Sequence, residues 1–248
     1  MKYKKILLTG GSGSLGHAII KLKHFKNFLA PPSKILDITD AKKIRDFFEK
    51  NDFDAIIHCA AFARMSECEK NPEKAILINV IGTANLVMNV IEKEKNLKRS
   101  IRFIFISTDG VYPGTRGNYS ESDETIPYNK YGWTKLGAEC AVNMLPNHCI
   151  IRTSFFDPKN INFEDAATDA YSSKVPIGYL VKSILVLLNN IFVGTINVGR
   201  EKRSDYRHYK EFKPNMKKCR LKDIQKNVPF AFYKDCSMNI NLWKKIEK

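Results

Sequence analysis

Residues 6–16 read ILLTGGSGSLG, and this stretch decides how the chain folds. Three apolar residues, a glycine-rich turn and the segment that follows predict a strand, a tight turn and a helix over Ser14–Phe25. The glycines match Gly-x-Gly-x-x-Gly at positions 11, 13 and 16, and Gly-x-x-Gly-x-x-Gly at positions 10, 13 and 16. Such a turn lets a pyrophosphate approach the backbone and the free N–H groups of the helix. The opening therefore predicts a dinucleotide-binding turn, with candidate contacts at Gly10, Ser12, Gly13, Ser14, Leu15 and Gly16.

A second stretch carries groups that can move a proton. Ser107, Thr108 and Asp109 directly follow the apolar run 101–106, so they are expected at the carboxyl end of a buried strand, where open α/β sheets bind ligands. Tyr131 and Lys135 are four residues apart and share one helix face. An ammonium there lowers the pKa of a tyrosine, which is ordinarily about 10. This spacing alone is common in helices, but after a glycine-rich turn it predicts a hydride-transfer site.

The region after Phe28 predicts how the adenosine half of a cofactor is bound. Pro31-Pro32-Ser33-Lys34 offers no carboxylate to the ribose hydroxyls of NAD, whereas Ser33 and Lys34 suit a 2′-phosphate, so NADP is slightly preferred over NAD. Asp37, expected at a strand end, is a candidate for the adenine. Asp40 is expected to cap a helix over residues 41–50.

Two polar residues fall inside apolar runs. His58, in the expected buried strand over 54–61, is predicted to be a packed core histidine. Asn79 interrupts an apolar helix expected over 72–94, so it either braces neighbouring backbone or holds a water near the site.

Composition indicates one α/β domain with a small appendage, because the chain has 248 residues, 44% of them hydrophobic. The six cysteines form no Cys-x-x-Cys pair and no metal-ligand spacing, which predicts reduced thiols in a cytoplasmic protein without a metal site. We expect no stretch long enough to cross a membrane.

The net charge of +15 is concentrated at the C-terminal end, where residues 200–248 hold 15 Lys and Arg against 6 Asp and Glu. Such a segment suits nucleic acid or an anionic small molecule such as a nucleotide diphosphate, and coding bias explains it equally well. No nucleic-acid-binding module is recognisable, so we expect no nucleic-acid partner.

These motifs, taken in order, resemble the extended short-chain dehydrogenase/reductase family and, within it, the dTDP-4-dehydrorhamnose reductases. The matching segments are Thr9–Gly16, Leu36–Asp40, Ala60-Ala61, Cys68–Pro72, Asn79–Thr83, Ser107–Asp109, Asn129–Leu136 and Arg152–Ser154. The resemblance implies a Rossmann-type, doubly wound parallel sheet built from residues 1–155 and 177–199. Residues 156–176 and 200–248 would form a small C-terminal substrate-binding subdomain.

The resemblance also implies roles for individual residues. Thr108, Tyr131 and Lys135 would be catalytic. Cofactor contacts would come from the glycine turn, Ser33, Asp37 and Ile38 at the adenine, Ala60 and Ala61 at the nicotinamide ribose, and Phe62, Asn79, Ser107, Tyr131, Lys135 and Ser154. The substrate would meet Thr108, Asp109, Gly110 and Phe155. The basic residues Arg200, Lys202, Arg203 and Arg207 would hold its diphosphate.

The implied activity is NAD(P)H-dependent reduction of the C4 keto group of a dTDP- or UDP-linked 4-keto-6-deoxy sugar, for polysaccharide precursors. Related dehydratases carry a Glu where this chain has Gly110, which favours reduction over dehydration. A nucleotide-sugar epimerase of the same fold and a non-catalytic NADP-binding regulatory subunit stay open as alternatives. A homodimer is compatible with the family.

Overall fold

The computed structural model describes residues 3–22 and 28–248. Its centre is a six-stranded sheet in the order β10-β5-β4-β3-β1-β2, with all neighbouring strands parallel. The strands are β1 (Ile6–Thr9), β2 (Phe28–Leu29), β3 (Ala55–His58), β4 (Arg102–Ile106), β5 (His148–Arg152) and β10 (Gly194–Asn197). From β1 the chain runs to β2 on one side and then to β3 on the other. Ligands bind at such a reversal of strand order, beyond the carboxyl ends of the strands.

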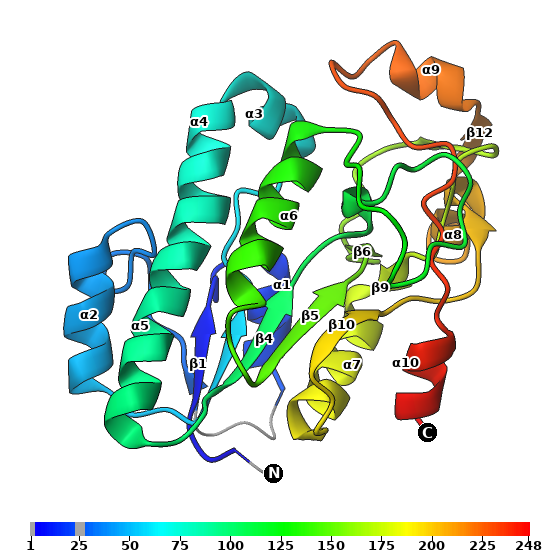
Figure 1. Ribbon diagram of the computed structural model, residues 1–248. Helices are drawn as coiled ribbons and strands as arrows, with labels where there is room; N and C mark the ends of the chain where they lie inside the picture. The colour runs from blue at the N-terminus through cyan, green and yellow to red at the C-terminus, as the bar shows by residue number, and fades with distance from the viewer. Residues whose placement is uncertain (1–2, 23–27) are drawn as a thin grey trace.

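Helices cover both faces of this sheet (Figure 1). Helices α1 (Ser14–Ile20) and α7 (Ile177–Asn189) lie on one face, and α2 (Ala41–Lys50), α5 (Gly82–Leu97) and α6 (Lys130–Val142) on the other. Successive strand side chains point to opposite faces. Leu8 and Ile57 therefore pack under α1 and α7, while Leu7 and Ile56 pack under α2, α5 and α6. The Rossmann-type, doubly wound sheet expected from the sequence is confirmed.

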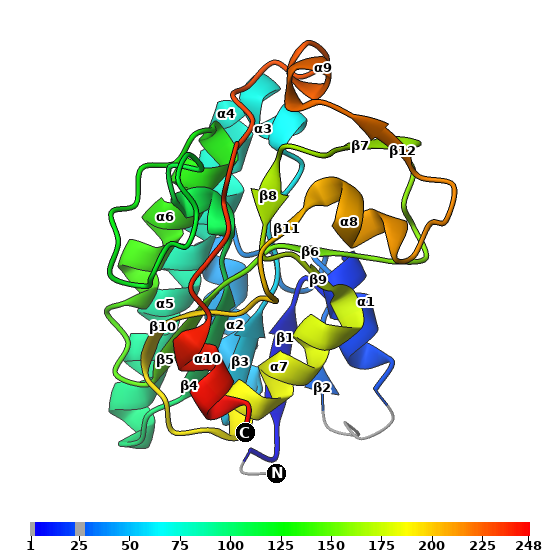
Figure 2. The same ribbon diagram turned by 90° about the vertical axis from the view of Figure 1, so that its right-hand side faces the viewer.

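Three short strand pairs gather beyond the carboxyl ends of the central strands (Figure 2). They are β6 (Phe155–Phe156) with β9 (Val175–Pro176), β7 (Asp165–Ala167) with β12 (Lys217–Cys219), and β8 (Tyr171–Ser172) with β11 (Arg203–Ser204), accompanied by α8 (Asp205–Lys210) and α9 (Leu221–Gln225). The last two pairs join residues 156–176 to residues beyond 200. The final helix, α10 (Asn241–Ile246), instead returns to the central domain, where Trp243 Nε1 donates to Tyr179 Oη of α7 at 2.8 Å.

Two boundaries differ from the sequence expectations. Helix α1 ends at Ile20, and the end expected at Phe25 lies outside the described residues. Asp37 lies beside a turn rather than at a strand end, because the paired part of the second strand ends at Leu29. The cap expected at Asp40 is confirmed, since its carboxylate accepts from Lys43 N at 3.1 Å at the start of α2.

The long apolar helix runs over Pro72–Leu97 as α4 (Pro72–Ala75), the π-helical turn η1 (Ile76–Ile81) and α5, after a short α3 (Met65–Lys70). The expectation that no stretch could cross a membrane is wrong by length and composition, because these 26 residues have a mean hydropathy of 1.6 over the most apolar window. A helix packed in a protein core meets the same criterion, and 44% of that window is buried in this structure.

The cysteines give a chemical test of the packing. All six are free, and Cys140 is the one exposed thiol, whereas burial raises the pKa of Cys59 and Cys149 to about 12. Since the thiolate is the reactive form, a disulfide reagent at pH 8 should modify one thiol quickly and the other five slowly. Cys140→Ser should remove the fast phase. Fast reaction of two or more thiols would contradict this packing.

Candidate functional site

Two cavities meet at the turn between β1 and α1. The outer cavity, of about 690 Å³, lies between this turn, residues 30–39 and the end of β3. The inner cavity, of about 290 Å³, lies beyond the ends of β4 and β5. Both cavities are lined by Gly10, Gly13, Cys59 and Ala61. The glycine turn is therefore the shared wall of one elongated space.

Glycine is required here by close backbone packing. Gly10 has a φ of +73°, and a Cβ on it would lie 2.5 Å from Ala60 N. A Cβ on Gly16 would lie 2.2 Å from Gly10 O. Both contacts are too short for any other residue, so the glycines hold the turn directly against the end of β3.

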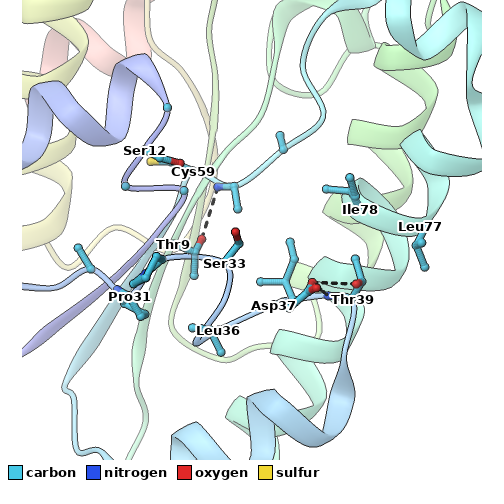
Figure 3. Close-up of a pocket in the computed structure, with 18 of the residues that line it drawn as sticks. Thr9, Ser12, Pro31, Ser33, Leu36, Asp37, Thr39, Cys59, Leu77 and Ile78 are labelled. Carbon is cyan, nitrogen blue, oxygen red and sulfur yellow. Dashed lines mark hydrogen bonds between the residues drawn. The ribbon is translucent and has the colours of Figure 1, made fainter.

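The outer cavity holds the residues expected around an adenosine (Figure 3). Ser33, Asp37 and Ile38 line it together with Ala60 and Ser12. Asp37 Oδ1 accepts from Thr39 N at 2.9 Å and from Thr39 Oγ1 at 2.7 Å, and these hydrogen bonds lower the pKa of the carboxyl. Lys34, expected to face a 2′-phosphate, is exposed and does not line the cavity.

The inner cavity brings together the three expected catalytic side chains. Thr108, Tyr131 and Lys135 all line it, beside Ser14, Leu15, Gly16, Ser107, Asp109, Ser154 and Phe155. Thr108 follows β4, and its hydroxyl accepts from Gly110 N at 3.0 Å and donates to Asp109 Oδ1 at 3.3 Å. Tyr131 and Lys135 lie one turn apart on α6.

Local capping positions α6 against the end of β4. Asn129 caps the helix by accepting from Gly132 N at 2.8 Å. A Cβ on Gly132 would lie 2.3 Å from Gly110 O, so only glycine allows the first turn to approach this closely. Tyr131 is thereby placed near Thr108.

Burial dominates the electrostatics of the site. It raises the pKa of Tyr131, with smaller contributions from Cys68 and Asp109. It lowers the pKa of Lys135 to about 7, against the opposing effect of Glu139. The expected lowering of the Tyr131 pKa by Lys135 is therefore not found in this structure, because burial disfavours both charged forms. Lys135 Nζ lies 3.9 Å from the centre of the Phe105 ring, and a cation is attracted to such a ring face.

A buried ion pair that the sequence motifs did not predict, between Arg152 and Glu139, supports this helix. Glu139 accepts from Arg152 Nη2 at 2.7 Å and from Ser107 Oγ at 2.5 Å. Glu139 lies one turn beyond Lys135, so the spacing Tyr131-Lys135-Glu139 was the available signal. The pair joins α6 to β5 and to the residue before Thr108.

Besides Lys34, three residues expected at the site line neither cavity: Phe62, Asn79 and Gly110. Asn79 lies in the π-helical turn, where its side chain accepts from Phe62 N at 2.7 Å and donates to Phe62 O at 3.0 Å and to Thr134 Oγ1 at 2.8 Å. Of the two roles considered for Asn79, bracing the neighbouring backbone is the one these contacts show.

The structure places the basic C-terminal residues away from both cavities. Arg200 and Arg203 pair with Glu211, and Lys202 pairs with Asp235. Lys202, Arg203 and Arg207 line a separate hollow on the small subdomain. Their expected role in holding a diphosphate at the reacting site is therefore not supported by this geometry.

His58 is buried in the core, as expected, between the hydroxyls of Thr9 at 2.6 Å and Thr83 at 2.9 Å. Burial lowers its pKa from 6.5 to about 3, so between these values the unfolded chain binds a proton that the folded protein does not. The free energy of unfolding should fall with decreasing pH in this window, by up to ~1.4 kcal/mol per pH unit. Urea titrations of His58→Gln should show a shallower fall. An unchanged slope would mean that His58 is protonated in the folded protein.

The chain is similar to proteins named as reductases and to a subunit of methionine adenosyltransferase 2. It is 36% identical over 163 residues to the probable low-salt glycan biosynthesis reductase Agl14 of Haloferax volcanii, covering 60% of this chain and 52% of the relative. It is 36% identical to a dTDP-4-keto-6-deoxy-D-glucose reductase of Streptomyces niveus (60% and 51% covered). It is 31% identical to the methionine adenosyltransferase 2 subunit beta of Rattus norvegicus (56% and 42%). The chain spans about half the length of the curated relatives it matches.

A solved structure has the same fold over nearly the whole chain. The dTDP-4-dehydrorhamnose reductase of Bacillus anthracis, solved in complex with NADP, gives a TM-score of 0.86 at 24% identity, covering 98% of this chain and 92% of that chain. The model of the RmlD substrate binding domain family matches residues 4–174, well over half of the sequence. The chain therefore belongs to the RmlD substrate binding domain family.

Proposed function

We propose that this protein is an NAD(P)H-dependent reductase of the C4 keto group of a nucleotide-linked 4-keto-6-deoxy sugar. One observation carries the proposal: Thr108, Tyr131 and Lys135 line one cavity, which continues past the glycine turn into a second, larger one. The elongated space suits a dinucleotide whose adenosine lies in the outer cavity and whose nicotinamide lies in the inner one. Two of the relatives support the proposal by their names, a probable glycan biosynthesis reductase and a dTDP-4-keto-6-deoxy-D-glucose reductase.

The residues that line the outer and inner cavities would hold NADPH or NADH, which would supply a hydride to the carbonyl carbon. Tyr131 donates its phenolic proton to the carbonyl oxygen, so that the C=O group becomes CH–OH and a phenolate is left to take a proton from solvent. The raised pKa of Tyr131 keeps it protonated before the reaction. The Thr108 hydroxyl, whose single proton goes to Asp109 Oδ1 in this structure, would turn to donate it to the same oxygen. Lys135, when protonated, stabilises the phenolate, and Glu139 favours that protonated form.

The residues of the outer cavity fit either cofactor, with NADP favoured. Ser33 offers a hydroxyl where a carboxylate would repel a 2′-phosphate, and Lys74 is the cation among the residues that line the cavity. The free cysteines support our proposal that the protein works in the reducing cytoplasm. Exposed apolar side chains on η1, α5 and α6, among them Ile81, Met88 and Trp133, support a homodimer that uses this face of the protein.

The direct test is oxidation of NADPH and of NADH by the purified protein, offered dTDP- and UDP-linked 4-keto-6-deoxy sugars. Turnover with one combination of cofactor and sugar nucleotide would establish the class of reaction, and that combination would identify the cofactor and the nucleotide. If the protein binds NADPH but no sugar nucleotide supports oxidation, the proposed activity is wrong.

A second candidate is a non-catalytic, NADP-binding regulatory subunit. It is favoured by the similarity to the methionine adenosyltransferase 2 subunit beta. Size-exclusion chromatography with a methionine adenosyltransferase catalytic subunit distinguishes the two. A stable complex without reductase turnover supports regulation, whereas turnover without a complex supports the reductase.

A further inference from the structure

Three basic side chains beyond residue 199 line a hollow of their own on the small subdomain, which we call the basic hollow. It has a volume of about 340 Å³ and is lined by Thr168, Tyr171, Lys202, Arg203, Ser204 and Arg207. None of the described residues that line it also lines the outer or the inner cavity. Strands β8 and β11 pair antiparallel beside α8 and bring these segments together (Figure 2). The hollow is therefore a separate place from the reacting site.

The side chains of the basic hollow are all hydrogen-bond donors. Three are cationic and three carry a hydroxyl, and no carboxyl group occurs among the described residues that line the hollow. Arginine and lysine are the side chains that proteins use to bind phosphate oxygens, and a guanidinium can make two parallel hydrogen bonds to one phosphate. A cation would be repelled here. This composition therefore favours an anion that carries several oxygens.

Arg207 is the cation of this group that is left without a partner. Its side chain is exposed and makes no hydrogen bond, ion pair or ring contact within residues 3–22 and 28–248. Arg203 donates from Nη1 to Glu211 at 2.9 Å, and a guanidinium has five donors. Lys202 pairs with Asp235, and an ammonium has three donors. All three cations therefore keep donors that a ligand can use.

The two carboxylates next to the basic hollow differ in how they are held. Glu211 pairs with Arg200 at 3.6 Å and with Arg203 at 2.9 Å, and these side chains are 38–44% exposed. The side chain of Asp235, which pairs with Lys202, is only 7% exposed. Exposed ion pairs contribute little to stability, so an anion can displace Glu211 from Arg203 at low cost. Asp235 is a fixed part of the fold.

The size of the basic hollow indicates how large the anion is. A water molecule occupies about 30 Å³ in the liquid, so 340 Å³ has room for more than one phosphate group. Three cations in one wall also match an anion with more than one negative charge. The one aromatic ring among the described residues of the wall, that of Tyr171, has Lys202 Nζ 4.8 Å from its centre. The ammonium covers a ring face on which a nucleobase could otherwise stack.

We propose that the basic hollow is a second anion-binding site, which binds a diphosphate group through Lys202, Arg203 and Arg207. It is distinct from the glycine turn, and the inference does not depend on the reductase activity. The diphosphate could belong to inorganic pyrophosphate or to a nucleotide, since both present the same oxygens to the three cations.

The test is isothermal titration calorimetry of the purified full chain with inorganic pyrophosphate at physiological ionic strength. Arg207→Gln should weaken binding about tenfold, because it removes a charge-assisted hydrogen bond from the unpaired guanidinium. Arg45→Gln is the matched control, since Arg45 is exposed on α2, on the opposite side of the molecule from α8 (Figure 1). It removes the same charge and should bind pyrophosphate as the wild type does. Neither substitution changes the glycine turn, so the difference between them reports the basic hollow.

Glu211→Gln should change the affinity in the opposite direction. It removes the carboxylate that competes for Arg203, so pyrophosphate should bind roughly two- to fivefold more tightly, the fold-change that corresponds to an exposed ion pair. Glu49→Gln removes the same charge from an exposed position on α2 and should leave the affinity unchanged.

The outcomes decide both the site and its ligand. Equal affinities of Arg207→Gln and Arg45→Gln for pyrophosphate, or no measurable binding, overturn the proposal. Inorganic phosphate that binds as tightly as pyrophosphate overturns the assignment to a diphosphate. ADP that binds at least as tightly as pyrophosphate, and is weakened by Arg207→Gln, identifies a nucleotide as the source, whereas weaker ADP binding identifies pyrophosphate. These titrations need no sugar substrate, so they stand whether or not the protein is a reductase.

Discussion

Tyr131→Phe is expected to lower kcat for reduction of the sugar nucleotide by roughly 10²- to 10⁴-fold, the usual contribution of a general acid. The ring remains, so the packing of the inner cavity is kept and only the proton donor is lost. The dissociation constant for NADPH, measured by fluorescence titration, should change little. Both measurements are needed because a misfolded variant would lose activity and binding together.

Tyr206→Phe is the matched control, because Tyr206 lies on α8 and lines neither the outer nor the inner cavity. It should retain full activity. A Tyr131→Phe protein that still turns over at the wild-type rate would eliminate Tyr131 as the proton donor. The carbonyl oxygen would then take its proton from water or from another side chain.

Glu139→Gln should destabilise the protein by about 3–5 kcal/mol, the typical effect of breaking a buried ion pair. Arg152 is 7% exposed, and its guanidinium bonds both carboxylate oxygens of Glu139. The substitution leaves this charge buried without its counter-ion. Loss of Glu139 also removes a group that raises the pKa of Lys135, so this pKa should fall and the limb of the kcat profile that reports Lys135 should shift towards lower pH. If the ammonium is required, activity near pH 7 should fall.

Glu211→Gln is the corresponding surface control. Glu211 pairs with Arg200 and Arg203, and all three side chains are 38–44% exposed. Exposed pairs contribute about 0–1 kcal/mol, so urea unfolding of this variant should resemble that of the wild type. If Glu139→Gln and Glu211→Gln lowered the free energy of unfolding equally, the buried ion pair would contribute no more to stability than the exposed one.

Local patterns were enough to predict most of the central domain. The glycines at 10, 13 and 16, the apolar run 101–106, the buried strand expected over 54–61 and the Tyr131-Lys135 spacing each act over a few residues, and the backbone rules that interpret them are local. They predicted the turn and the three side chains of the inner cavity, and the family resemblance that they carry implied the parallel sheet. The Asp40 cap was predicted for the same reason.

Contacts between distant segments were not predictable in this way. The bond from Asn79 to the Phe62 backbone depends on a π-helical turn that the sequence pattern does not show. The basic residues after Arg200 looked available for the diphosphate of the substrate, but folding places them away from the reacting site and brings Glu211 and Asp235 against them. A charge count cannot reveal such pairing, because it depends on which segments meet.

The sequence by itself determined the fold class, the dinucleotide turn and the identity of the groups that can move a proton. Only the tertiary structure decided the surroundings of the charged side chains: Glu139 against Arg152, Arg203 against Glu211, and Arg207 unpaired among the described residues. The physical reason is that a residue type specifies which chemistry is available. Burial and partners from elsewhere in the chain then set its charge, its pKa and the ligand that it can bind.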